Sequence, residues 1–166
     1  MANPIIEIKV TNFGTMKAEL YPEIAPVTVE NFLKLISEEF FDGLVFHRVI
    51  EGFMIQGGGY NAQFEHKDAS PIKGEFAANG WIRNDLRHTP GVLSMARTSD
   101  PNSASSQFFI MHKDSPHLDG QYAGFGKVTE GLEVVDKIAG VHTVRYGYMS
   151  DIPCEPVVIE SIRVIG

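Results

Sequence analysis

The chain has 166 residues, and we expect one domain spanning 1–166. Its hydrophobic fraction of 43%, with eleven Phe, is enough for a packed core. The formal charge of −7, without a basic stripe, excludes a general nucleic-acid binder. We expect no membrane segment and no secretory signal. The single cysteine, Cys154, cannot form an internal disulfide, which favours a cytoplasmic location.

The start of the chain predicts a hairpin followed by a helix. Apolar residues alternate with charged ones on both sides of 12–14, as in two strands joined by a turn. Four apolar residues then recur at the i, i+3, i+4, i+7 spacing of one helix face: Val29, Phe32, Leu33 and Ile36. Pro26 fits the first turn of this helix, and Thr28 is the candidate cap.

The rest of the chain predicts mainly strands. Six strand-like segments are expected at 44–50, 53–56, 91–96, 107–112, 122–128 and 157–165. Long loops separate some of them at 60–90, 97–105 and 140–156, and a second short helix is expected at 132–139. Many strands with only two helices favour a mainly β fold, a closed barrel with the helices covering its ends.

The usual catalytic devices are missing from the sequence. There is no G-x-S-x-G motif, and Ser94 lies within a strand pattern. The six histidines are dispersed, and no Cys/His cluster has zinc spacing, so we expect no metal and no cofactor. The three glycines at 57–59 lack the Lys-Ser/Thr ending of a phosphate loop. An enzyme with this sequence would catalyse a reaction that makes and breaks no covalent bond.

One stretch, FHRVIEGFMIQGGG at 46–59, places Arg48 among apolar residues, which is costly unless the cation has a use. In QFFIMH, the period of a strand puts Gln107 and Phe109 on one face. Met54 and Gln56 share a face in the same way. Both pairs combine an amide with an apolar group, as a binding site does. The alternative is that the apolar members are core residues and the glutamines cap loops.

Five motifs decide between these interpretations. FHRVIEGFMIQGGG, GVLSMAR, NSASSQFFI, LDGQYAGFGKV and EGLEVVDKI occur in the order, and close to the spacing, of the cyclophilins, and the chain resembles the bacterial cytosolic branch of that family. The resemblance implies a peptidyl-prolyl cis-trans isomerase on an eight-stranded antiparallel barrel capped by two α-helices. It also implies proline-containing peptides and unfolded or folding proteins as partners. We expect a monomer, because no long apolar surface stripe is left over.

The resemblance assigns roles residue by residue. It makes Arg48 the catalytic residue and implies a substrate-binding set of Phe53, Met54, Gln56, Ala96, Arg97, Gln107, Phe109, His117, Leu118 and Tyr122. For Phe53 and Met54 to line one pocket, the chain must be irregular around Glu51–Gly52. His117 stands where many members carry a tryptophan that contacts cyclosporin A, so we expect weak cyclosporin A binding. Tyr122 stands where many carry a histidine.

These residue types suit rotation about a proline amide. The twisted amide loses resonance and exposes a nitrogen lone pair, and Arg48 is a permanently charged donor that can stabilise it. None of these groups must change protonation, so we expect activity to be nearly flat across neutral pH. Two rivals remain open: a non-catalytic module that binds proline-containing peptides, and a small-molecule carrier that uses the lumen of the barrel. The presence of Arg48 favours the enzyme, and a barrel of this size is filled by its own side chains.

Overall fold

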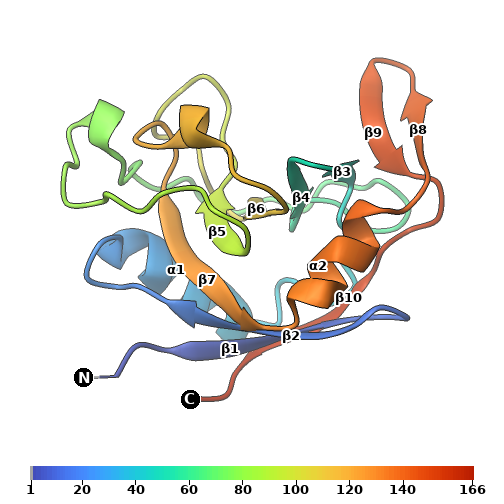
Figure 1. Ribbon diagram of the computed structural model, residues 1–166, viewed down its shortest axis with the longest axis horizontal. Helices are drawn as coiled ribbons and strands as arrows, with labels where there is room; N and C mark the ends of the chain where they lie inside the picture. Colours follow the sequence, from blue (N-terminus) through green and yellow to red (C-terminus); the bar gives the residue numbers. More distant parts are fainter. Residues whose placement is uncertain (1) are drawn as a thin grey trace.

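A computed structural model describes residues 2–166, and Met1, the first residue of the expected domain, lies outside the described residues. The elements in chain order are β1 (Ile5–Val10), β2 (Gly14–Leu20), α1 (Pro26–Ser37), β3 (Arg48–Ile50), β4 (Met54–Gly57), the 3-10 helix η1 (Ala77–Asn79), β5 (Val92–Met95), β6 (Phe108–Met111), the 3-10 helix η2 (Pro116–Leu118), β7 (Gly124–Glu130), α2 (Leu132–Ala139), β8 (Thr143–Tyr146), β9 (Met149–Pro153) and β10 (Ile159–Val164). Strands dominate, and both expected α-helices are present (Figure 1).

Eight strands form one antiparallel sheet in the order β10-β1-β2-β7-β5-β6-β4-β3. The expected mainly β, eight-stranded antiparallel architecture is confirmed. The expectation of a closed barrel is wrong, because the two ends of the sheet meet through an isolated bridge between Val45 and Val158 rather than through a strand ladder. The segment before β3 bonds to the start of β10 through Phe46 N–H to Val157 O at 3.0 Å and Ile159 N–H to Leu44 O at 2.8 Å, but Val45 N–H donates instead to Tyr60 O at 2.8 Å.

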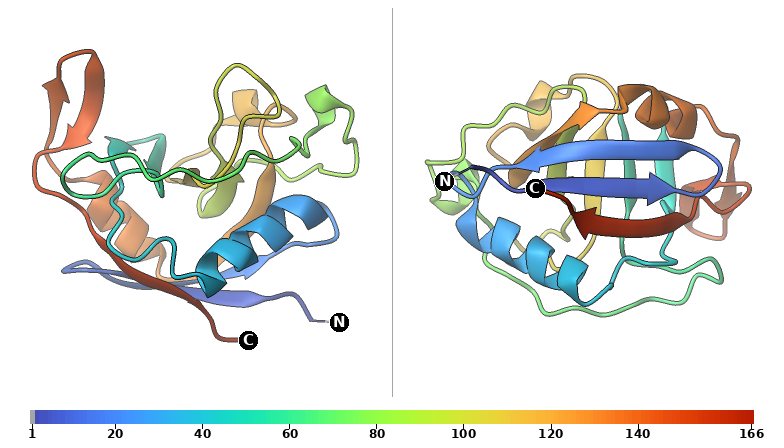
Figure 2. Two further views of the ribbon diagram at one scale, coloured as in Figure 1. Left: turned by 180° about the vertical axis from the view of Figure 1, so that it is seen from behind. Right: turned by 90° about the horizontal axis from the view of Figure 1, so that it is seen from below.

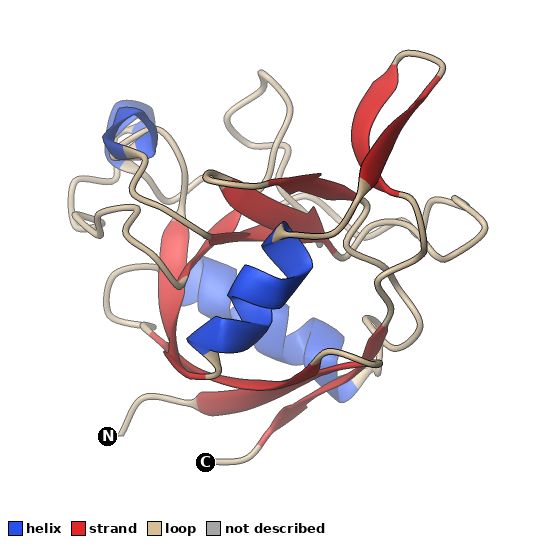
Figure 3. Ribbon diagram, turned by 45° about the vertical axis from the view of Figure 1, so that its right-hand side comes forward, coloured by secondary structure: helices blue, strands red, loops and turns tan. Residues whose placement is uncertain are grey.

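The helices lie at opposite openings of the curved sheet. In Figure 3, α2 lies in front of the ring of strands and α1 lies behind it. The apolar stripe of α1 includes Val29, Phe32 and Ile36, all buried, and that of α2 includes Val134 and Ile138. Each helix therefore buries the face that its sequence period predicts.

Aromatic rings fill the interior between the sheet and α1. The Phe32 ring lies 4.9 Å from Phe41, 5.3 Å from Phe108 and 5.0 Å from Phe125, measured between ring centroids. All four side chains are at most 1% exposed. Because these rings occupy the middle of the fold, the structure argues against a carrier that uses the lumen.

The start of α1 is stabilised differently from the expectation. Thr28 does not cap the helix; the N-cap position is Ala25, which has no side-chain cap. Instead the Glu75 carboxylate, from the long loop before β5, accepts the Thr28 N–H and the Thr28 hydroxyl, both at 2.7 Å, and the Val27 N–H at 3.2 Å. A carboxylate at this position satisfies free N–H groups of the first turn and favours the positive end of the helix dipole.

Most other expected strands are present but shorter. The expected strand at 44–50 is regular only over Arg48–Ile50, and the expected strand at 157–165 only over Ile159–Val164. The expected loop at 140–156 is wrong, because it contains the β8–β9 hairpin, which projects from the barrel (Figure 2). Gly147, with φ +61°, lies in its turn, and the hairpin buries Ile152 while its two tyrosines are exposed. The sequence did not predict this hairpin, because the exposed Tyr146 and Tyr148 break the alternation of apolar and polar residues that is typical of a half-buried strand.

Candidate active site

The β3–β4 hairpin builds the first part of the site. Arg48 pairs directly with Gln56 across the two strands, so their side chains share one face. Arg48 Nη1 donates to Gln56 Oε1 at 3.3 Å, and Gln56 Nε2 donates to Gln107 Oε1 at 3.1 Å. The three side chains therefore form a polar row in which each glutamine orients its neighbour.

This row borders a small pocket of about 120 Å³. The pocket is lined by Arg48, Phe53, Met54, Gln56, Ala96, Arg97, Phe109, Leu118 and Tyr122. All but two of the residues expected at the site therefore lie in its wall. The other two adjoin it: Gln107 through its bond to Gln56, and His117 by stacking on Phe53 with ring centroids 6.0 Å apart.

The irregularity expected at Glu51–Gly52 is a turn that brings adjacent residues into one wall. Gly52 has φ +82°, which favours glycine, and Phe53 N–H donates to Ile50 O at 3.0 Å. The chain resumes as a strand at Met54. Phe53 is thus still part of the turn and is not bound by the alternation of β4, and for this reason it can line the same pocket as Met54.

The pocket floor is apolar and buried. Met54, Phe109 and Leu118 are 1%, 5% and 7% exposed and pack together with Val92 and Met111 in a cluster separate from the main core. This separation means that the pocket has its own hydrophobic support. An arginine at the edge of such a seat interacts more strongly with a bound group than it would in water.

A buried polar chain supports Phe109 from behind, and the sequence did not reveal it. The His88 ring stacks on Phe109 with centroids 6.0 Å apart. Its Nδ1 lies 3.0 Å from Asp119 Oδ1 and its Nε2 lies 2.8 Å from Ser94 Oγ. Burial lowers the pKa of His88 although Asp119 opposes the change, so the ring is neutral, donating to Asp119 and accepting from Ser94. Ser94 is fully buried and cannot serve as a nucleophile.

Arg97 also lines the pocket, but its guanidinium is occupied. Nη2 donates to Gln121 O at 2.7 Å and Nη1 donates to Thr98 O at 2.9 Å. The same group lies 4.7 Å from the ring centroids of both Phe76 and Tyr122. Arg97 is thus held between two rings, whereas the Arg48 side chain has one hydrogen bond, to the Gln56 amide, and is exposed.

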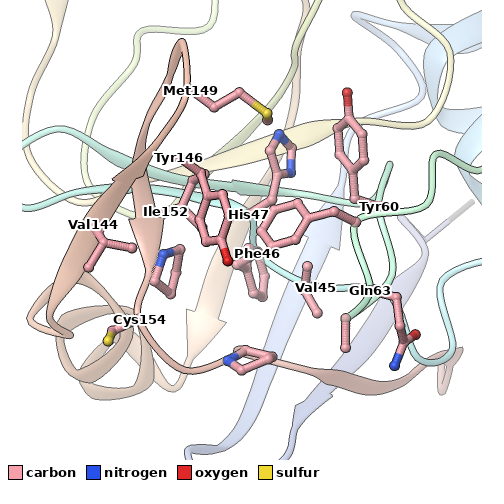
Figure 4. A pocket seen from close by; sticks show the side chains of 14 residues that line it. Val45, Phe46, His47, Tyr60, Gln63, Val144, Tyr146, Met149, Ile152 and Cys154 are labelled. Carbon is pink, nitrogen blue, oxygen red and sulfur yellow. The ribbon is translucent and has the colours of Figure 1, made fainter.

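A larger cavity of about 520 Å³ lies between the β8–β9 hairpin and the loop after β4 (Figure 4). Its lining is mostly aromatic and aliphatic, includes His47, Tyr60 and Tyr146, and contains no Lys, Arg, Asp or Glu. Burial and the neighbouring Arg48 lower the pKa of His47 to about 4, so this histidine is neutral near pH 7. The cavity therefore provides no cation comparable to Arg48.

Over residues 2–166 no three His, Cys, Asp or Glu side chains gather closely enough to hold a metal ion. None of the helices in the same range is both long enough and apolar enough to cross a membrane. The described chain thus offers a charged donor beside a small apolar seat and a buried serine. Such a site can seat a small uncharged group and orient it by hydrogen bonds.

Comparisons with known proteins point to one family. Residues 5–164 match the model of the family described as cyclophilin type peptidyl-prolyl cis-trans isomerase/CLD. The chain is 46% identical over 170 residues to a peptidyl-prolyl cis-trans isomerase of Acinetobacter baylyi, which covers 99% of this chain and 87% of the relative. It is 45% identical over 163 residues to peptidyl-prolyl cis-trans isomerase B of Escherichia coli, which covers 93% of this chain and 96% of the relative.

Solved structures lead to the same family. A cyclophilin type peptidyl-prolyl cis-trans isomerase of Cryptosporidium parvum has a TM-score of 0.84 at 28% identity, covering 99% of this chain and 98% of that one. Its structure in the presence of the dipeptide Ala-Pro has a TM-score of 0.82 at 29% identity, covering 98% and 99%. The chain belongs to the cyclophilin-type peptidyl-prolyl cis-trans isomerase family. Its activity is accordingly the cis-trans isomerisation of peptide bonds that precede proline.

Proposed function

We propose that Arg48 is the catalytic residue of this isomerase and that the pocket beside it holds the proline ring. The single observation that carries the proposal is the position of Arg48, an exposed cation on the rim of a pocket of about 120 Å³ with a buried apolar floor. Phe53, Met54, Phe109 and Leu118 supply the apolar seat. A proline ring is small and uncharged, so it suits this volume and lining.

Catalysis follows if Arg48 binds the twisted form of the proline amide more strongly than the planar form. Rotation about an amide bond has a barrier of about 18–20 kcal/mol, because the planar form is stabilised by resonance. In the twisted form the nitrogen regains a lone pair. A guanidinium N–H directed at this lone pair stabilises the twisted form more than the planar one, and this difference lowers the barrier. Arg48 remains charged at any physiological pH, which supports an activity that is flat across neutrality.

The two glutamines give the substrate its orientation. Gln56 uses its oxygen to accept from Arg48 and its Nε2 to donate to Gln107. This direction leaves the Gln107 amide nitrogen to donate to a carbonyl of the substrate backbone. Ala96 and Tyr122 complete the wall on the other side. The substrate backbone on one side of the proline amide must be held still. Rotation about the amide bond then turns the other side of the peptide relative to it.

The test is NMR exchange spectroscopy on a short peptide that contains Ala-Pro. Arg48→Ala is expected to lower the catalysed exchange rate about 100-fold, the usual loss when one donor to a transition state is removed. Peptide signals still shift on addition of the variant, because the apolar seat is intact. Arg83→Ala is the matched control, since Arg83 is exposed and stacks on Trp81 outside the pocket. Full activity in Arg48→Ala contradicts the proposal.

We propose one isomerase domain across 1–166 that acts as a monomer in the cytoplasm on proline-containing segments of unfolded or folding proteins. The open, shallow position of Arg48 supports broad use of such segments. His117, stacked on Phe53, supports weak binding of cyclosporin A in place of the tryptophan contact. Titration with cyclosporin A while exchange is monitored tests this, and inhibition at equimolar drug would contradict it.

A further inference from the structure

The turn between β3 and β4 is held by a residue outside the pocket, His112. Its main-chain N–H donates to Phe53 O at 2.9 Å, and its side chain accepts the Gly52 N–H at Nδ1, also at 2.9 Å. His112 follows directly after β6. One residue therefore binds two consecutive members of the turn, and the second of them, Phe53, lines the pocket.

These contacts determine which ring nitrogen carries the proton. A main-chain N–H can only donate, so Nδ1 of His112 must be unprotonated. The proton is then on Nε2, which lies 2.9 Å from Asp136 Oδ1 in α2 and donates to that carboxylate. Asp136 thus selects the tautomer that can hold Gly52. The side chain of His112 is only 9% exposed, whereas that of Asp136 is 65% exposed, so the ring is held in place while its carboxylate partner faces water.

The bond between Gly52 and His112 affects the pocket because Phe53, the next residue, lines it. Gly52 has φ +82° and nothing within 4 Å of the place where a side chain would begin, so packing alone does not fix this turn. Main-chain bonds hold Phe53 to Ile50 and to His112, and the bond from Gly52 N–H to His112 Nδ1 adds a side-chain constraint on the residue between them. Displacing a substrate-binding group by about 1 Å can cost as much as 100-fold in rate. The angle at which Phe53 meets the proline ring therefore depends on His112.

We propose that His112 is a positioning residue for isomerisation, with Asp136 holding its tautomer, and that it acts through Phe53. The inference rests on the proposed function of the pocket. It assigns His112 no contact with substrate. Loss of His112 is expected to raise the free energy of the bound twisted amide. A proline seat that moves distinguishes less well between the planar and the twisted amide.

The primary experiment is a double-mutant cycle on the catalysed exchange rate. His112→Leu is expected to lower kcat/KM about three- to tenfold, the range for loss of one hydrogen bond. In the Phe53→Ala background the same substitution is expected to have no further effect, because its target is gone. His66→Leu is the matched control, since His66 forms the same kind of pair with Asp68 at 2.7 Å but lies outside the pocket.

Two more variants keep the test decisive if His112→Leu folds poorly. His112→Asn retains an oxygen acceptor near the Nδ1 position and is expected to recover most of the lost rate. Asp136→Ala alters an exposed residue and is expected to lower the rate by releasing the tautomer. Nitrogen-15 NMR of the wild-type ring is expected to show Nδ1 bare and Nε2 protonated; the reverse would overturn the assignment.

The outcomes separate the two proposals. If Arg48→Ala is as active as the wild type, the proposed function fails. If Arg48→Ala is inactive while His112→Leu and Asp136→Ala keep full kcat/KM, only the role of His112 fails. Additive losses in the cycle with Phe53→Ala also overturn it, because they mean that His112 acts by another route.

Discussion

Acid is expected to destabilise this protein through His47, a histidine buried without charge beside Arg48. Burial lowers the pKa of His47 to about 4 in the folded state. A histidine in the unfolded chain has a pKa of about 6.5. Between these values the unfolded state binds a proton that the folded state does not bind. The free energy of unfolding therefore falls as the pH drops from 6.5 towards 4 and is constant below that window as far as His47 is concerned.

The size of the loss follows from the two pKa values. Each unit between 6.5 and about 4 is worth about 1.4 kcal/mol, so the full loss from His47 is about 3 kcal/mol. By pH 5 the unfolded chain is almost fully protonated at this position and the folded one is not, so about 2 kcal/mol is lost there. This is a large part of the stability of a domain of this size, about 5–15 kcal/mol.

Urea unfolding at pH 8 and pH 5 measures the effect. His47→Phe keeps a ring against Tyr60, which lies 4.7 Å from the His47 ring, but cannot bind the proton. The variant is expected to lose about 2 kcal/mol less than the wild type between the two pH values. His88, whose pKa burial also lowers, adds a loss of the same sign in both proteins and cancels from the comparison. Equal losses in the two proteins would refute the reasoning.

Three further substitutions test the packing and the site. Phe32→Ala is expected to lower the free energy of unfolding by about 3–5 kcal/mol in urea titrations, because it empties the centre of the ring cluster; a loss below 1 kcal/mol contradicts that role. Glu75→Gln is expected to cost about 2 kcal/mol by the same measurement, because one oxygen that accepts from the start of α1 becomes a donor; an unchanged midpoint contradicts it. Gly59→Ala places a methyl group 2.5 Å from Gln107, so exchange spectroscopy is expected to show a roughly tenfold lower rate with little change in stability; wild-type activity contradicts it.

The sequence predicts the architecture and the pocket well because both depend on local patterns. Strand alternation placed Gln107 with Phe109, and Gly52 marked the turn that lets Phe53 join Met54. Motifs that resemble a known family then connected segments far apart in the chain. Side chains from four of the five motifs line one pocket in the structure, whereas EGLEVVDKI contributes none to it.

The polar supports behind the pocket could not be predicted in this way. His88 meets Asp119 and Gly52 meets His112 across separations of 31 and 60 residues. Glu75 reaches Thr28 across 47. A lone polar residue in a loop has no period, so its partner depends on how the whole chain folds. The seam of the barrel is a similar case, because it joins the segment before β3 to the segment before β10, which are more than 100 residues apart.

The first strand, β1, pairs with the last, β10, on the side of the sheet that lies opposite the short strands β3, β4 and β6 in Figure 1. Ile5 N–H donates to Gly166 O at 3.1 Å, and Ile165 N–H donates to Ile5 O at 2.8 Å. A short linker could therefore join the termini, and a cut in the loop at 60–90 would create new ones. Every strand would keep its neighbours in such a permuted chain. A permuted chain would thus build the same sheet from strands that follow one another in a different order along the chain. The segments that line the pocket would then be synthesised in a different order.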